Sequence, residues 1–138
     1  MNIFLGERSY PIGVGSGVLG RLPEVVRGLR GLVVTDAHVE AFHGARVMEL
    51  LGPDWGHIVL PPGESTKSAV QWAQLLEQIA ASRLDRRGVL VALGGGVVGD
   101  LAGFAAASYM RGIRFVQIPT SLLAMVDSSV GGKTGINL

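Results

Sequence analysis

The residues with the clearest chemical use in this chain are a run of closely spaced glycines. The segment Gly94-Gly95-Gly96-Val97-Val98-Gly99 has the spacing G-x-G-x-x-G, directly after an apolar run and at the start of a helical pattern. Glycine lets the backbone approach a phosphate closely, and free N–H groups at a helix start favour negative charge. The motif therefore predicts a dinucleotide site, with a plain tight turn between strand and helix as the alternative.

Two features set this motif apart from the ordinary Rossmann form. That form has an acid about 20 residues further on, which binds the ribose. Here Ile118-Pro119-Thr120-Ser121 occupies that place, and the motif follows a late strand instead of the first. We expect a dinucleotide to bind by a less common plan.

A second glycine-rich loop carries a lysine. Val130-Gly131-Gly132-Lys133-Thr134 resembles the end of a Walker A loop, but Asp127 stands where that pattern requires its first glycine. An acid at that position would face the nucleotide phosphates, which argues against a P-loop. Lys133 remains a candidate ligand for a phosphate or an oxyanion, and a solvated loop lysine is the alternative.

The segment from Leu60 to Ser68 leaves a predicted strand, turns, and begins a helix, with Ser65 or Thr66 as the expected N-cap. Loop chemistry alone accounts for it, and the alternative is that Glu64 and Lys67 hold ribose hydroxyls or an adenine edge. The three histidines of the chain, His38, His43 and His57, do not have the spacing of a zinc site.

The elements that must position these residues follow from alternating apolar patterns. Short runs rich in β-branched residues predict strands covered on both faces, at 31–35, 55–60, 89–93 and 114–118. Helical spacing predicts helices at about 37–51 and 69–80, and a third after Gly99 that stops near Gly112. The first thirty residues suggest a strand at 10–14 and a helix at 18–29. This order predicts an α/β fold, a parallel sheet flanked by helices.

Composition narrows the class of protein. The chain has 138 residues, a net charge of +1 and no cysteine, which argues against nucleic-acid binding and against a disulfide framework. The apolar stretch 88–110 has Asp100 in its middle and three consecutive glycines, which disfavours a membrane span. We therefore expect one domain of a cytoplasmic protein, with neither nucleic acid nor a membrane as its partner.

Taken together, three segments resemble the 3-dehydroquinate synthases, a family of sugar phosphate cyclases. They are 60–68, 93–112 and 117–134. The resemblance implies a Rossmann-like domain in a phosphate-eliminating lyase of the shikimate route to aromatic amino acids. Such an enzyme uses catalytic NAD to convert 3-deoxy-D-arabino-heptulosonate 7-phosphate to 3-dehydroquinate and phosphate.

The resemblance also implies roles for the residues that match the family's motifs. On the cofactor side these are Asp36, Glu64, Lys67, Gly95, Gly96, Val97, Gly99, Asp100, Thr120, Ser121 and Leu123. On the substrate side, Asp127 would meet ring hydroxyls and Lys133 a carboxylate or developing oxyanion. Arg111 would reach the substrate phosphate in the neighbouring subunit of a homodimer. Ser121 replaces the commoner threonine, and His38 stands where the family often has asparagine.

The family's divalent metal, zinc or cobalt, is held by one Glu and two His in a mainly helical C-terminal domain, outside this chain. We therefore expect residues 1–138 to form the N-terminal NAD-binding domain, a half-site that is not a competent enzyme alone. Three alternatives remain: a cyclase that makes an inosose or valiolone, a protein like the polyol dehydrogenases, and a non-catalytic nucleotide-binding module.

Overall fold

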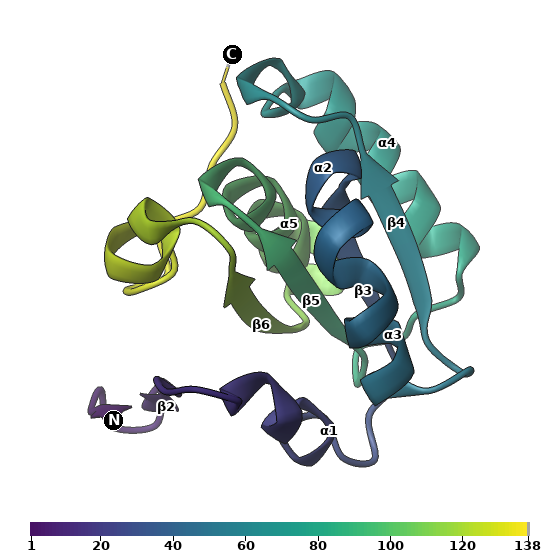
Figure 1. Cartoon of the computed structure of the whole chain (residues 1–138). Coiled ribbons are helices and arrows are strands. Elements are labelled where there is room, and N and C mark those ends of the chain that lie inside the picture. Colours follow the sequence, from purple (N-terminus) through teal and green to yellow (C-terminus); the bar gives the residue numbers. More distant parts are fainter. Residues whose placement is uncertain (138) are drawn as a thin grey trace.

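A four-stranded parallel sheet forms the centre of the computed structural model, which describes residues 1–137. Its strands are β3 (Gly31–Asp36), β4 (Gly56–Leu60), β5 (Val89–Gly94) and β6 (Arg114–Pro119). They lie in the order β4-β3-β5-β6, and every neighbouring pair is parallel (Figure 1). The limits of the four predicted strands are confirmed to within one residue at each end. The predicted cover on both faces is correct for β3 and β5, but β4 and β6 are edge strands and are partly exposed.

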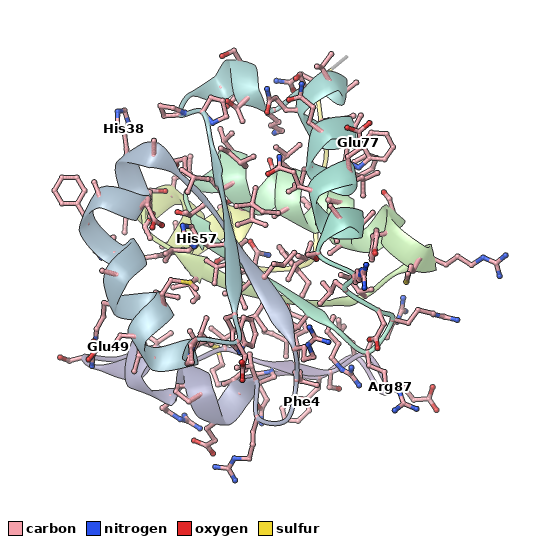
Figure 2. All side chains as sticks on the ribbon, turned by 90° about the vertical axis from the view of Figure 1, so that its right-hand side faces the viewer. Phe4, His38, Glu49, His57, Glu77 and Arg87 are labelled. Carbon is pink, nitrogen blue, oxygen red and sulfur yellow. The ribbon has the colours of Figure 1, made fainter. Side chains whose placement is uncertain are left out.

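The helices cover both faces of the sheet. One face carries α1 (Leu22–Val25), α2 (Ala37–Val39), the π-helical turn η2 (Glu40–Gly44) and α3 (Ala45–Leu51). The other carries α4 (Ala69–Ala81) and α5 (Gly96–Ser108). In Figure 2, Glu49 of α3 and Glu77 of α4 lie on opposite sides of the sheet. This follows from right-handed crossovers, because the connection from β3 to β4 runs in the opposite direction to the one from β4 to β5.

Two apolar clusters hold these layers together. Leu75 of α4, Leu90 of β5 and Leu101 of α5 are fully buried in the larger cluster, between the sheet and α4–α5. Val33 and Val47 are buried in the smaller cluster, which faces α1 and α3. The sheet is therefore anchored on both sides, and the residues at its carboxyl edge are held by a rigid frame.

Three helix boundaries differ from the prediction. The cap of α4 is Ser68, whose Oγ accepts a hydrogen bond from the N–H of Gln71 at 3.3 Å. Thr66, one of the two predicted caps, instead donates its hydroxyl to the carbonyl of Pro61 at 2.7 Å. Helix α5 begins at Gly96, so Gly99 lies inside it; a Cβ there would come within 2.8 Å of Oε1 of Gln117. Gly99 is buried there, beside the side chain of Gln117 on β6.

The third difference is at the end of α5, which stops at Ser108. A short 3-10 turn, η4 (Tyr109–Arg111), then carries the chain to Gly112, where φ is 110°. The helical segment 37–51 has the expected limits but contains the π-helical turn η2. It ends before Gly52, whose φ of 88° takes the chain out of the helix.

The amino-terminal prediction was too regular. Strands β1 (Asn2–Ile3) and β2 (Tyr10–Pro11) form a small antiparallel pair, so the predicted strand 10–14 is much shorter. The predicted helix 18–29 is a 3-10 turn, η1 (Val18–Arg21), followed by α1, which ends at Val25. Gly28, with φ at 74°, stops any continuation. No helix within residues 1–137 has the length and apolar character needed to cross a bilayer.

Candidate functional site

The carboxyl ends of β3 and β5 lie side by side and define the place where a ligand is expected. Thr35 of β3 is opposite Leu93 of β5, and the chain leaves these two strands toward opposite faces of the sheet. In open α/β sheets, ligands bind in the crevice at such a switch point. Asp36 ends β3 and the glycine segment ends β5, so the topology brings these predicted residues to one edge.

Asp36 is fixed in place by the backbone that follows it. Its Oδ1 accepts hydrogen bonds from the N–H groups of His38 at 2.8 Å and Val39 at 3.0 Å. The carboxylate therefore caps α2 as well as standing at the switch point. Figure 2 shows the side chain of His38 projecting outward from the molecule.

Gly94, Gly95 and Gly96 connect the end of β5 directly to the start of α5. A Cβ on Gly94 would come within 2.6 Å of the Cβ of Val98, so the strand can turn into the helix only with glycine there. Gly95 and Gly96 face the hydroxyls of Ser121 and Ser128, each 3.4 Å from an added Cβ. These two serines follow β6 in the sequence. Gly95, Gly96 and the hydroxyls of Ser121 and Ser128 therefore line one surface, the glycine cradle.

The N-terminus of α5 differs from those of α2 and α4, which also follow strands of the sheet. Asp36 caps α2 and Ser68 caps α4, whereas no side chain of the described residues caps α5 at Gly95. The first N–H groups of this thirteen-residue helix are therefore available to an anion. Together with the cradle, this matches the chemistry of a pyrophosphate.

An ion pair joins the loop after β4 to α5. Nζ of Lys67 lies 2.6 Å from Oδ2 of Asp100, and both side chains are about one-fifth exposed. The hydrogen bond that Lys67 donates to Asp100, and then the negative charges of Asp100 and Glu64, raise the pKa of Lys67 above its usual value, while burial opposes the rise. The sequence prediction had placed both residues at the cofactor, and the structure shows that they bind one another.

This raised pKa predicts how stability depends on pH. A lysine whose pKa is higher in the folded state contributes its full stabilisation below the unfolded value of 10.5 and loses it as pH rises through the folded value. Asp100→Asn should therefore have a lower free energy of unfolding at neutral pH and a flatter decline in the alkaline range. Urea unfolding over a pH series measures this. Parallel curves for the two proteins would show that the pair contributes nothing.

The predicted substrate residues lie on the loop after β6. Asp127 is exposed in the π-helical turn η5 (Ala124–Ser128), and Lys133 is exposed in the segment beyond it. The N–H of Gly131 donates to the hydroxyl of Tyr10 at 2.9 Å, which ties this loop to β2. On the cofactor side, Thr120 donates its N–H to the carbonyl of Gly94 at 3.0 Å, and Leu123 is exposed.

Arg111 is the one predicted residue that lies away from the others. It is exposed in η4, at the carboxyl end of α5, where β6 begins. Because the strands are parallel, this is the opposite edge of the sheet from the glycine cradle. Its predicted role in a neighbouring subunit stays a prediction.

Sequence reasoning missed Ser128, which faces Gly96, and two residues that make hydrogen bonds at the predicted site. Tyr10 holds the loop at Gly131, and Asn137 donates from its side chain to Oε1 of Glu64 at 3.1 Å. Neither residue belongs to a recognisable motif, and their partners are 121 and 73 positions away. For the segment that carries Asn137, the one signal in the sequence is Gly103, because a Cβ there would clash with Thr134.

A metal site would need several His, Asp or Glu side chains close together. Within residues 1–137, no three or more His, Asp or Glu side chains gather in a way that could hold a metal ion. The described residues therefore do not fit a metal centre of their own.

A parallel sheet with helices on both faces and a glycine turn at the switch point defines a Rossmann-like α/β domain. Residues 57–138 match the family model described as "3-dehydroquinate synthase N-terminal". The chain therefore belongs to the 3-dehydroquinate synthase family.

Relatives support this assignment. The 3-dehydroquinate synthase of Rhodospirillum rubrum is 54% identical, with 99% of this chain and 37% of that protein covered. Among solved structures, a 2-deoxy-scyllo-inosose synthase complexed with carbaglucose-6-phosphate, NAD+ and Co2+ is 28% identical. The match covers 100% of this chain and 39% of that synthase, with a TM-score of 0.88.

A 2-epi-5-epi-valiolone synthase from Streptomyces hygroscopicus subsp. jinggangensis, with NAD+ and Zn2+ bound, gives a TM-score of 0.85 at 32% identity. The match covers 99% of this chain and 39% of that synthase. The chain thus spans less than two-fifths of the length of each of these three relatives.

Proposed function

We propose that this chain forms the NAD-binding part of a 3-dehydroquinate synthase, which converts 3-deoxy-D-arabino-heptulosonate 7-phosphate to 3-dehydroquinate and phosphate in the shikimate pathway. The observation that carries the proposal is the uncapped start of α5 behind Gly95 and Gly96, at the switch point between β3 and β5. Identity of 54% to a 3-dehydroquinate synthase, against 28% to the inosose synthase, favours this substrate over those of the other cyclases.

Different residues of the site would bind different parts of NAD. The N–H groups at the start of α5 would bind the pyrophosphate, and Gly95 and Gly96 let the backbone come close to it. Asp36, Glu64 and Lys67 would hold the adenosine ribose. Val97, Asp100, Thr120, Ser121 and Leu123 would contribute the remaining lining, whereas Gly99 is buried inside α5.

Bound NAD would supply the transient oxidation of a ring alcohol, which acidifies the neighbouring C–H and lets phosphate leave. Asp127 would accept hydrogen bonds from ring hydroxyls, and Lys133 would neutralise a carboxylate or developing oxyanion. Both lie in the part of the chain after β6, which also carries Ser121 and Ser128. The substrate phosphate would be met by Arg111 of a second subunit in a cytoplasmic homodimer, and zinc or cobalt would be held outside this chain.

A titration of the purified chain tests the cofactor. NAD at about 100 times its Kd should raise the free energy of unfolding by about 2.7 kcal/mol. Gly96→Val should remove this effect, because its side chain would occupy the cradle beside Ser128. Gly20→Val is the matched control, since an added Cβ at Gly20 meets nothing within 4 Å.

The outcome that contradicts the proposal is equally specific. Stabilisation by Mg·ATP without any by NAD would identify the Gly131–Thr134 loop as the nucleotide site. Stabilisation by NAD that survives Gly96→Val would place the cofactor away from the start of α5.

A further inference from the structure

The segment Thr134–Asn137 runs from the Lys133 loop across α5 to the start of α4. Thr134 packs against Gly103, where no Cβ fits, and Ile136 packs against the larger apolar cluster. At its end, Asn137 makes a parallel β-bridge with Ser68. Figure 1 shows the C-terminal end of the chain rising beside the loop that precedes α4.

Asn137 binds the loop that carries two predicted cofactor residues, and it does so at two points. Its backbone N–H donates to the carbonyl of Lys67 at 2.8 Å. Its side-chain Nδ2 donates to Oε1 of Glu64 at 3.1 Å. Lys67 in turn reaches Asp100 of α5. One residue thus joins the loop after β4 to the segment that follows the substrate loop.

We propose that Asn137 is a positioning residue for the cofactor, which it serves by ordering Glu64 and Lys67 before the adenosine ribose binds; this rests on the proposed function. Glu64 is exposed on a short 3-10 turn, η3 (Glu64–Thr66), so its side chain would otherwise sample many rotamers. Fixing Oε1 leaves Oε2 to accept a ribose hydroxyl, and an ordered side chain loses less entropy when the ligand binds.

The same contacts couple the two halves of the site. Lys133 and Asn137 are four residues apart on one segment, so a change in the substrate loop that shifts this segment also moves the loop with Glu64. Asn137 is therefore one point at which substrate-side and cofactor-side residues of this chain are linked, beside the contacts of Thr120, Ser121 and Ser128 with the glycines.

Two variants of Asn137 test its role, with affinities measured by calorimetric titration of the whole chain. Asn137→Ala should weaken NAD and ADP-ribose by about threefold to tenfold, the loss of one hydrogen bond. Asn137→Asp should weaken them more, because it keeps the size but sets a second carboxylate against Glu64. Binding of nicotinamide mononucleotide, which lacks the adenosine half, should be unchanged. Asn2→Ala, in β1, is the matched control.

A second readout needs no cofactor. The N–H groups of Thr66 and Lys67 donate to the carbonyls of Gly63 and Glu64 at 3.1 and 3.0 Å. In Asn137→Ala these two amides should exchange with solvent at least about threefold faster, while the amides in the middle of α5 keep their protection.

The failures are distinguishable. If the wild-type chain binds NAD and both variants bind it equally well, with unchanged exchange at 66 and 67, the role of Asn137 is wrong and the proposed function stands. An equal loss for NAD and for the mononucleotide would indicate general distortion, which also overturns the role. A wild-type chain that binds no NAD contradicts the proposed function itself.

Discussion

Lys67→Met should weaken NAD binding by about 10- to 100-fold, the value of a hydrogen bond that involves charged groups. The substitution removes the ammonium group proposed to hold the ribose. It also leaves the carboxylate of Asp100, about one-fifth exposed, without its partner in the first two turns of α5. That unpaired negative charge would lie near the site proposed for the pyrophosphate. Calorimetric titration with NAD measures the loss.

Two further variants separate the charge of Lys67 from its position. Lys67→Arg keeps the charge and should retain only part of the affinity. The larger guanidinium would replace an ammonium whose Nζ lies 2.6 Å from Oδ2 of Asp100. Arg86→Met removes an exposed cation from the loop between α4 and β5 and should change nothing. Affinity equal to wild type in Lys67→Met would mean that Lys67 serves only to pair with Asp100.

Leu90→Ala should have the largest effect on stability, a loss of about 2–5 kcal/mol. Leu90 is fully buried on β5, where it belongs to the larger cluster between the sheet and α4–α5. Truncation leaves a cavity in the centre of the fold, because neighbouring strands hold the backbone in place on both sides. Domains of this kind have a total stability of about 5–15 kcal/mol, so the loss is a large part of it. Urea unfolding by circular dichroism measures it.

The matched control for this variant is Leu122→Ala. Leu122 is 75% exposed, so the same truncation there should change the free energy of unfolding by less than about 0.5 kcal/mol. Comparable losses for the two leucines would contradict the placement of the core.

Some features of this protein could be predicted from the sequence because they depend on local patterns. The four strands of the sheet are short apolar runs, and their limits were correct to within one residue. Burial on both faces holds for the inner strands β3 and β5, whereas the edge strands β4 and β6 are partly exposed. The junction at Gly94 is a steric requirement, since a Cβ would meet Val98 four residues on. The family resemblance likewise depended on contiguous motifs, and the match over residues 57–138 confirms it.

The helix limits show where local patterns are ambiguous. Ser65, Thr66 and Ser68 are all good N-caps by type, and the carbonyl of Pro61, which binds Thr66, decides between them. Gly99 looked like the end of a turn, but it lies inside α5, where it is buried beside Gln117 of β6. In the first thirty residues, glycines with positive φ interrupt the regular elements that spacing alone suggested.

Only the tertiary structure decided which site residues meet. Lys67 and Asp100 are 33 residues apart, and Asn137 is 73 residues from Glu64, so no sequence spacing connects them. The same parallel topology that gathers Asp36 and the glycine cradle at one edge puts Arg111 at the other, because it follows the far end of α5. Sequence patterns specify elements through local sterics and burial, whereas contacts between distant residues depend on how the sheet orders its strands.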